Sequence, residues 1–328
     1  MSPISAGRTA GTVPADHALP QDKQTVGSSL FRGRGRFTFT VMSPMSGGKD
    51  LPAPVFFRDD GYRGMGLSKG LARGLQVMVD GVDLTQEGMG LGTIAIRSRG
   101  YTYFARHGQA TWINGQQLHL DYLIDTVHVS RRKDQETASP LLTRIRELGV
   151  VLYRRLPALQ PVMLRTGVKV RRGLGIQSAF VPVPPLARAQ FQFKFEPYRV
   201  AARVLFDALA GDIDEIFLMN ELGADFFDCG WQAGGLIKPP QGWEVLEDTD
   251  RLPFLSSSSQ QIRYSLAEIT VNPDVPFKVC WGREHIADLC WAGFTIQINP
   301  VVSPISGLIC RYTIVFQDGE HEGVAHGT

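Results

Sequence analysis

Residues 191–206 read FQFKFEPYRVAARVLF, and this stretch indicates the type of fold most clearly. Phenylalanines alternate with polar residues up to Glu196-Pro197, and apolar residues then recur at every second position as far as Phe206. A period of two is that of a β-strand with one buried face, and a short turn between two such strands makes a hairpin. The stretch therefore predicts two antiparallel strands.

The same pattern continues on both sides of this hairpin. Asp80-Gly81 and Asn114-Gly115 each separate two runs of alternating apolar residues, and both dipeptides favour tight hairpin turns. Residues 262–269 and 308–316 also have the character of strands. A parallel α/β sheet would need a helix after most strands, and the sequence offers only one clear helix. We therefore predict an all-β protein with an antiparallel β-sandwich or barrel architecture.

One amphipathic helix is predicted between the β-rich halves. Ser139 is a suitable N-cap, Pro140 suits the first helical position, and Pro157 ends the apolar periodicity. The apolar stripe consists of Leu141, Leu142, Ile145, Leu148, Val151, Leu152 and Leu156, and the polar face carries Arg144, Arg146, Arg154 and Arg155. Such a helix can lie on an anionic membrane or cover a face or end of the sheet, and we favour the sheet. A short helical turn is expected at 159–164, and strand structure from Val168 and Val170 onward.

The chain divides into five segments by composition and periodicity. These are a flexible N-terminal tail (1–34), an N-terminal β-meander (35–130), a basic linker with the amphipathic helix (131–166), a C-terminal antiparallel β-domain (167–318) and a frayed C-terminus (319–328). No internal repeat is strong enough to show whether the two β-rich halves are separate domains or one continuous sandwich. A chain of this length can be a single all-β domain.

Composition gives the general class of the protein. The chain is 43% apolar and 20% charged, as in ordinary globular proteins, and no apolar run reaches the ~18 residues of a membrane span. A secretory signal pattern is missing from the first thirty residues, so a cytoplasmic protein is expected. Cys229, Cys280, Cys290 and Cys310 form no C-x-x-C pair, and we predict reduced core cysteines with no metal and no cofactor.

Charge is distributed unevenly although the net charge is only +2. Residues 131–172 contain eleven basic and three acidic residues, whereas 207–250 contain one basic and eleven acidic residues. These segments are either two solvated faces of one fold or complementary poles of neighbouring copies in a homo-oligomer. The Arg-Gly run at 32–36 has only three arginines and is not repeated, so nucleic acid is not an expected partner.

The strongest signal for a site lies in residues 277–300, FKVCWGREHIADLCWAGFTIQINP. Charged residues interrupt two apolar runs there, and buried charges are costly unless they are paired or functional. Together with the strand end near residue 220, this gives four candidate catalytic residues: Glu221 and Glu284 for acid–base chemistry, Arg283 to position or neutralise charge, and Asp288. The candidate ligand-binding residues are Asn220, Asp225, Trp231, Trp243, Trp281, His285 and Trp291. Alternatively, Arg283 pairs with Glu284 or Glu221 as a buried clamp, and the tryptophans belong to the core.

Two functions fit these features. The first is a cofactor-independent enzyme that binds a small apolar, aromatic or sugar-like ligand and acts on it by carboxylate acid–base chemistry, as a lyase, isomerase, cyclase or hydrolase. The second is a non-catalytic, self-assembling structural subunit of a shell or capsid-like kind. A ligand-binding protein without chemistry would share the pocket of the first.

Overall fold

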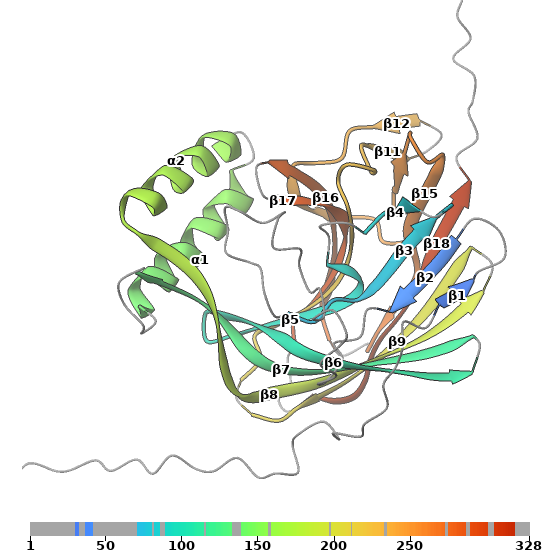
Figure 1. Ribbon diagram of the computed structural model, residues 1–328, viewed down its shortest axis with the longest axis horizontal. Helices are drawn as coiled ribbons and strands as arrows, with labels where there is room; N and C mark the ends of the chain where they lie inside the picture. The colour runs from blue at the N-terminus through green and yellow to red at the C-terminus, as the bar shows by residue number, and fades with distance from the viewer. Residues whose placement is uncertain are drawn as a thin grey trace, which may run out of the picture.

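The computed structural model describes residues 30–32, 37–41, 71–80, 82–85, 89–114, 116–132, 139–156, 159–196, 198–210, 212–232, 235–272, 275–286, 289–300 and 305–318. Within these ranges the chain forms antiparallel strands that join into one extended sheet, and two helices stand beside it (Figure 1). The predicted all-β antiparallel class is confirmed. The sequence indicated only one of the two helices clearly.

The elements follow one another along the chain as β1 (Leu30–Arg32), β2 (Phe37–Val41), β3 (Leu75–Val79), β4 (Val82–Asp83), β5 (Gly90–Ser98), β6 (Tyr101–Asn114), β7 (Gln117–Arg132), α1 (Pro140–Arg155), α2 (Gln160–Gly173), β8 (Ile176–Glu196), β9 (Arg199–Ala208), β10 (Glu215–Leu222), β11 (Cys229–Gln232), β12 (Gly235–Ile237), β13 (Gly242–Leu246), β14 (Phe254–Ser257), β15 (Ile262–Val271), β16 (Phe277–Ile286), β17 (Leu289–Ile298) and β18 (Ser306–Asp318).

The sheet curls so that two of its parts face each other as layers. One layer contains β13, β16, β17, β10 and β5 in that order, and the other contains β7, β8, β9, β18 and β15. Strand β6 pairs with both β5 and β7 and so connects the layers. Because β5 from the first half of the chain pairs with β10 from the second, the two predicted halves share one continuous sheet.

The core lies between these layers and contains the alternating apolar residues that the sequence indicated. Phe191, Phe193 and Phe195 of β8 are buried, as is every second residue of β9 from Val200 to Phe206. Across the interlayer space, the rings of Tyr264 and Phe294 pack edge to face with centroids 5.6 Å apart. Each such side chain contributes roughly 1.5–3 kcal/mol when it is removed from water.

Helix α1 begins where the sequence predicted. The Ser139 hydroxyl accepts a hydrogen bond from the Leu142 N–H, and Pro140 occupies the first turn. Polar contacts tie the start of the helix to β7: the N–H of Ser130 donates to the hydroxyl of Thr143, at 2.9 Å, and the N–H of Ser139 donates to the carbonyl of Ser130. Thr143 is buried at this contact.

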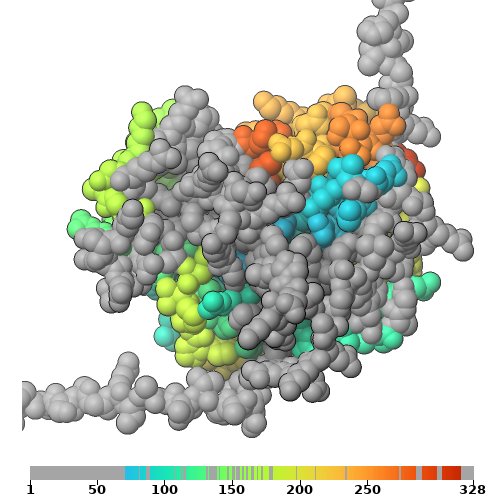
Figure 2. Space-filling view, in the orientation of Figure 1, coloured from blue at the N-terminus to red at the C-terminus, as the bar shows by residue number. Residues whose placement is uncertain are grey.

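The apolar stripe of α1 does not cover the sheet, so our preferred interpretation of it is wrong. Leu141, Ile145 and Leu148 are 57–67% exposed, and Leu152 and Leu156 are also exposed. The helix turns its Thr143 side to β7 instead, because the N-cap and the serine–threonine contacts fix its orientation. In the space-filling view the helical hairpin stands at the upper left margin of the molecule (Figure 2).

Helix α2 replaces the strand that we expected from Val168 onward. It runs from Gln160 to Gly173, and regular strand structure resumes only at Ile176. Two valines two residues apart were too short a pattern to indicate a strand, and the basic residues around them are compatible with a helix.

The predicted tail and frayed C-terminus lie largely outside the described residues. The exception is Leu30–Arg32, which the sequence assigned to the tail but which pairs with β2 as strand β1. None of the four cysteines forms a disulfide, and Cys280, Cys290 and Cys310 are buried. Among the described residues, neither helix has the length and apolar character needed to span a membrane.

Candidate functional site

The strand register places Glu221 and Glu284 on the same face of one layer. Glu221 of β10 pairs with Gly293 of β17, and Glu284 of β16 pairs with Trp291, two residues along the same strand. Residues two apart on a strand point to the same side, so the two carboxyl groups flank β17 from either side. The even-numbered residues of β17 from 292 to 298 belong to the interlayer core, and the glutamates therefore lie on the opposite face, which we call the carboxyl face.

Two tryptophans accompany Glu284 on the carboxyl face. The Trp291 indole N–H donates to Oε2 of Glu284 at 3.0 Å, and the Glu284 side chain is buried. The Trp291 ring stacks on that of Trp243, with centroids 4.0 Å apart and 19° between the planes. Trp243 comes from β13, where it pairs with Gly282, and it is half-buried. Trp243, Trp291 and Glu284 thus form one cluster.

Glu221 has a strongly perturbed pKa. Burial raises its pKa to about 7, a hydrogen bond with the Met89 backbone lowers it, and the negative charge of Glu284 raises it again. Near neutral pH the group is therefore divided between its acid and base forms, which is the condition for efficient general acid–base catalysis.

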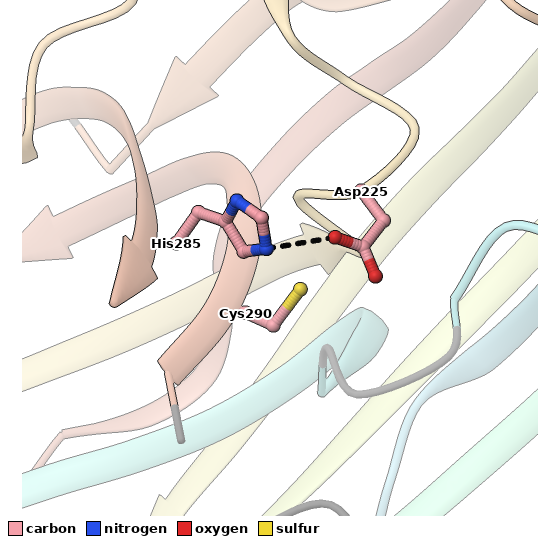
Figure 3. Close-up of side chains that lie close together, drawn as sticks. All are labelled: Asp225, His285 and Cys290. Carbon is pink, nitrogen blue, oxygen red and sulfur yellow. Dashed lines mark ion pairs between the residues drawn. The ribbon is translucent and has the colours of Figure 1, made fainter. Parts of the chain in front are cut away.

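The neighbours of Glu284 in the sequence lie on the other face of the same strand. The Arg283 guanidinium donates to the carbonyl oxygen of Ala224, at 3.0 Å from Nη2 and 3.3 Å from Nε. His285 Nε2 lies 2.9 Å from Oδ1 of Asp225, and Cys290 lies beside them (Figure 3). The alternative prediction of a clamp between Arg283 and either glutamate does not fit this arrangement.

Three of the predicted ligand-binding residues, Asn220, Trp281 and Trp231, lie away from the carboxyl face. Asn220 lies in the interlayer core, where its side-chain oxygen accepts hydrogen bonds from the Gly92 N–H, at 3.0 Å, and the Tyr312 hydroxyl, at 3.1 Å. Trp281 is also part of the core. Trp231 stacks with the guanidinium of Arg263, 4.0 Å from the ring centroid. The structure does not bring these three residues to the carboxyl face.

The predicted catalytic residue Asp288 lies outside the described residues. Cys290 is a partner of His285 that the sequence interpretation missed, because it treated all four cysteines as core residues. The signal was present in the spacing: His285 and Cys290 stand on either side of a short hairpin turn and pair directly across it. Met89, whose backbone bonds to Glu221, gave no signal of this role in the sequence.

Comparison with known proteins identifies no family for the chain. No protein-family model matches it, and no curated protein sequence matches it either. Among solved structures, a putative aldose 1-epimerase from Escherichia coli is similar with a TM-score of 0.35 and 8% identity, over 89% of this chain and 100% of that one. A galactose mutarotase related enzyme from Lactobacillus acidophilus is similar with a TM-score of 0.36 and 5% identity, over 90% and 99% of the two chains.

A galactose mutarotase-like protein from Clostridium acetobutylicum is similar at the same distant level. Its TM-score is 0.31 and its identity 9%, over 88% of this chain and 94% of that one. Likeness at this level assigns neither an activity nor a substrate to the present chain, because unrelated functions occur on similar β-folds.

Proposed function

We propose that the chain is a cofactor-independent acid–base catalyst that isomerises a small carbohydrate on the carboxyl face. The observation that carries the proposal is the pair of buried carboxyl groups flanking β17, one of which has a pKa raised to about 7. Isomerisation by proton transfer needs one group that gives a proton and one that takes a proton, and a carboxyl pair in unequal surroundings supplies both.

The two glutamates have different roles in this proposal. Glu221 is protonated up to about pH 7 and acts as the general acid. Glu284 accepts a hydrogen bond from Trp291 and acts as the general base. With an aldose, Glu284 removes the proton of the anomeric hydroxyl while Glu221 protonates the ring oxygen, so that the ring carbon–oxygen bond breaks and a carbonyl forms. Closure on the other face of the carbonyl returns both protons, and no redox change occurs.

The stacked tryptophans supply the binding surface for such a ligand. The apolar C–H face of a sugar ring is suited to an indole surface, and a few polar groups nearby then fix its orientation. Trp243 is half-buried on strand β13, whereas Trp291 is buried. In this proposal the ligand enters past Trp243 and meets Glu284 before Glu221.

The test is the rate of anomer exchange in a panel of aldoses that includes glucose and galactose, measured by magnetisation-exchange NMR. The wild-type protein should accelerate exchange for at least one aldose. Glu221→Gln and Glu284→Gln should each reduce that acceleration by about 10²–10⁴-fold, the usual contribution of a positioned acid or base. Glu244→Gln is the matched control, because Glu244 is an exposed residue of β13, next to Trp243 in the sequence.

Two results would contradict the proposal. Full acceleration in a folded protein that carries both Glu221→Gln and Glu284→Gln would exclude the carboxyl pair as the catalyst. No acceleration with any aldose in the panel would exclude the carbohydrate assignment.

A second candidate function, a self-associating structural subunit, is favoured by the exposed apolar side chains of the helices. Leu141, Ile145, Leu148, Leu152 and Leu156 of α1 and its C-cap are exposed, and so are Leu159, Val162, Val170 and Leu174 in and around α2. Large apolar side chains exposed in such number on one helical pair often mark an interface. In this proposal a second copy of the chain covers the exposed helices, and its acidic segment 207–250 contacts the basic segment 131–172 of the first copy.

Sedimentation velocity at low and high salt tests this second candidate. Self-association that weakens with salt, and that Leu141→Ser with Leu148→Ser abolishes, would support it. A monomer at every salt concentration would exclude it.

A further inference from the structure

Three metal-binding side chains converge on one point opposite the carboxyl face. Asp225, His285 and Cys290 each offer one ligand atom, and these atoms all lie within 4.8 Å of one another. Figure 3 shows the Nε2 side of the His285 ring facing both the Asp225 carboxylate and the Cys290 sulfur, while Nδ1 points away. His285 and Cys290 come from the consecutive strands β16 and β17, and Asp225 comes from a turn that is distant in the sequence but adjacent in the fold.

The strands and hydrogen bonds around this cluster hold its residues in place. His285 and Cys290 are direct partners in the β16–β17 register, so their side chains start from neighbouring positions on the same face. The turn that carries Asp225 is fixed by Arg283, whose guanidinium donates twice to the Ala224 carbonyl. The N–H of Gly223 also donates to the carbonyl of Leu84, at 2.8 Å, and ties the turn to the neighbouring β3–β4 segment.

The orientation of the histidine distinguishes a metal site from a nucleophilic triad. A Cys–His–Asp relay needs the cysteine at one ring nitrogen and the carboxylate at the other. Here the same nitrogen edge faces both partners, which is the geometry of ligands around a common centre. A thiolate, an imidazole and a carboxylate form the kind of mixed donor set that Zn²⁺ accepts.

We propose that Asp225, His285 and Cys290 bind Zn²⁺ through three protein ligands, with water at the fourth tetrahedral position. Bond lengths of about 2.0–2.3 Å place two ligand atoms of one Zn²⁺ roughly 3.3–3.6 Å apart. Asp225 Oδ1 and His285 Nε2 are 2.9 Å apart, and all three ligand atoms lie within 4.8 Å of one another. Rotation of the exposed Asp225 and His285 side chains brings the three atoms to the distances that one Zn²⁺ requires. The site opens to solvent because the side chains of Asp225 and His285 are about half exposed, whereas Cys290 forms its buried floor.

The site is independent of the proposed carbohydrate chemistry, because the two lie on opposite faces of β16 and β17. When Zn²⁺ binds, it displaces the thiol proton and replaces the Asp225–His285 contact, so that it links the turn at 223–227 to the β16–β17 hairpin. The expected consequence is a protein that unfolds at a higher temperature in the presence of the ion, since binding to the folded state alone stabilises it.

The test is the binding of Zn²⁺ and Co²⁺ to the metal-free full chain without a histidine tag. Zinc affinity is measured by competition with a chromophoric chelator, and Co²⁺ reports a thiolate ligand through its sulfur-to-metal charge-transfer band. We expect one ion per chain, a thiolate band, and a loss of Zn²⁺ affinity of more than about tenfold in each of Asp225→Asn, His285→Asn and Cys290→Ser. Cys229→Ser is the matched control, because Cys229 is the half-buried cysteine of β11 and lies outside the cluster.

The proposal is overturned if Co²⁺ gives no thiolate band, or if His285→Asn binds Zn²⁺ as tightly as the wild type. Cys290→Ser replaces a buried residue, and this variant can fail to fold. Asp225→Asn and His285→Asn change exposed side chains, so these two variants test Zn²⁺ binding even if Cys290→Ser does not fold.

Discussion

The two faces of the β16–β17 hairpin differ although neighbouring residues of the same two strands build both. The carboxyl face, with Glu284 and Trp291, is buried, and its electrostatics are dominated by loss of water. On the opposite face, which otherwise belongs to the interlayer core, the His285 and Asp225 side chains are about half exposed. Arg283, Glu284 and His285 are consecutive in the sequence, yet the middle residue belongs to one face and its neighbours to the other. The period of two thus places consecutive charged residues on two faces with different surroundings.

Adding a single methyl group at Gly282 should disrupt this arrangement most strongly. Its φ of +159° lies at the margin of the range that only glycine adopts readily, and a Cβ there would collide with the carbonyl oxygen of Gly242. Gly282→Ala should lower the free energy of unfolding by more than about 3 kcal/mol, measured by urea denaturation. Gly235→Ala is the control, since a Cβ at that position has its nearest neighbour 3.9 Å away, and it should be almost neutral. Equal effects of the two variants would show that β13 and β16 do not pack as described.

Glu221→Gln should reveal the cost of burying a carboxylate on the carboxyl face. The pKa of Glu221 is about 7 in the folded chain, above its ordinary value of 4.5, so the folded state keeps a proton that the unfolded state has already released. The free energy of unfolding therefore falls as the pH rises from about 4.5 to about 7, and it is lowest above pH 7. At ~1.4 kcal/mol per pKa unit, the glutamine variant should be about 3 kcal/mol more stable than the wild type at pH 8 and nearly equal to it at pH 4. Thermal unfolding across pH 4–8 measures this, and parallel profiles for the two proteins would contradict it.

Trp291→Phe should have the next largest effect. The substitution retains an aromatic ring against Trp243 but removes the N–H that donates to Glu284. Because Glu284 is buried, loss of this donor should cost about 1–3 kcal/mol of unfolding free energy. Trp243→Phe removes no hydrogen bond to the glutamate and serves as the comparison. A smaller loss for Trp291→Phe than for Trp243→Phe would mean that the stacking, and not the hydrogen bond, stabilises this cluster.

Asp225→Asn should have the smallest effect on the metal-free protein. The Asp225 and His285 side chains are both about half exposed, and such surface ion pairs contribute little. A change within about 0.5 kcal/mol is expected by urea denaturation without metal. A loss comparable to that of Trp291→Phe would remove the contrast between the buried Glu284–Trp291 pair and the half-exposed Asp225–His285 pair.

Much of the fold could be predicted from the sequence, because alternation and turn dipeptides are local signals. The 191–206 hairpin appears as β8 and β9, and β3 ends at Val79, just before the predicted Asp-Gly turn. The helix N-cap at Ser139 was also predicted correctly. The exposure of Leu141, Ile145 and Leu148 could not be predicted. An apolar stripe shows which face of a helix lacks polar side chains, but it does not show whether another part of the protein covers that face.

The candidate site could be predicted only in part. The sequence brought Glu221, Glu284 and Trp291 into one group, and the structure places them on one face. It also grouped Asn220 and Trp281 with them, although strand alternation turns both into the core. The cluster of Asp225, His285 and Cys290 depends on a turn that approaches the hairpin from a distant part of the chain, and no local pattern encodes that approach.

The most direct test of the carboxyl pair is the pKa of Glu221 itself, measured by NMR titration of its side-chain carboxyl carbon in the wild type, Glu284→Gln and His285→Asn. The structure predicts a pKa of about 7 in the wild type, a lower pKa when the charge of Glu284 is removed, and no change when the neighbouring His285 on the opposite face is replaced. A wild-type pKa near the ordinary 4.5, or one that does not respond to Glu284→Gln, would contradict the buried pair and with it the proposed acid–base function.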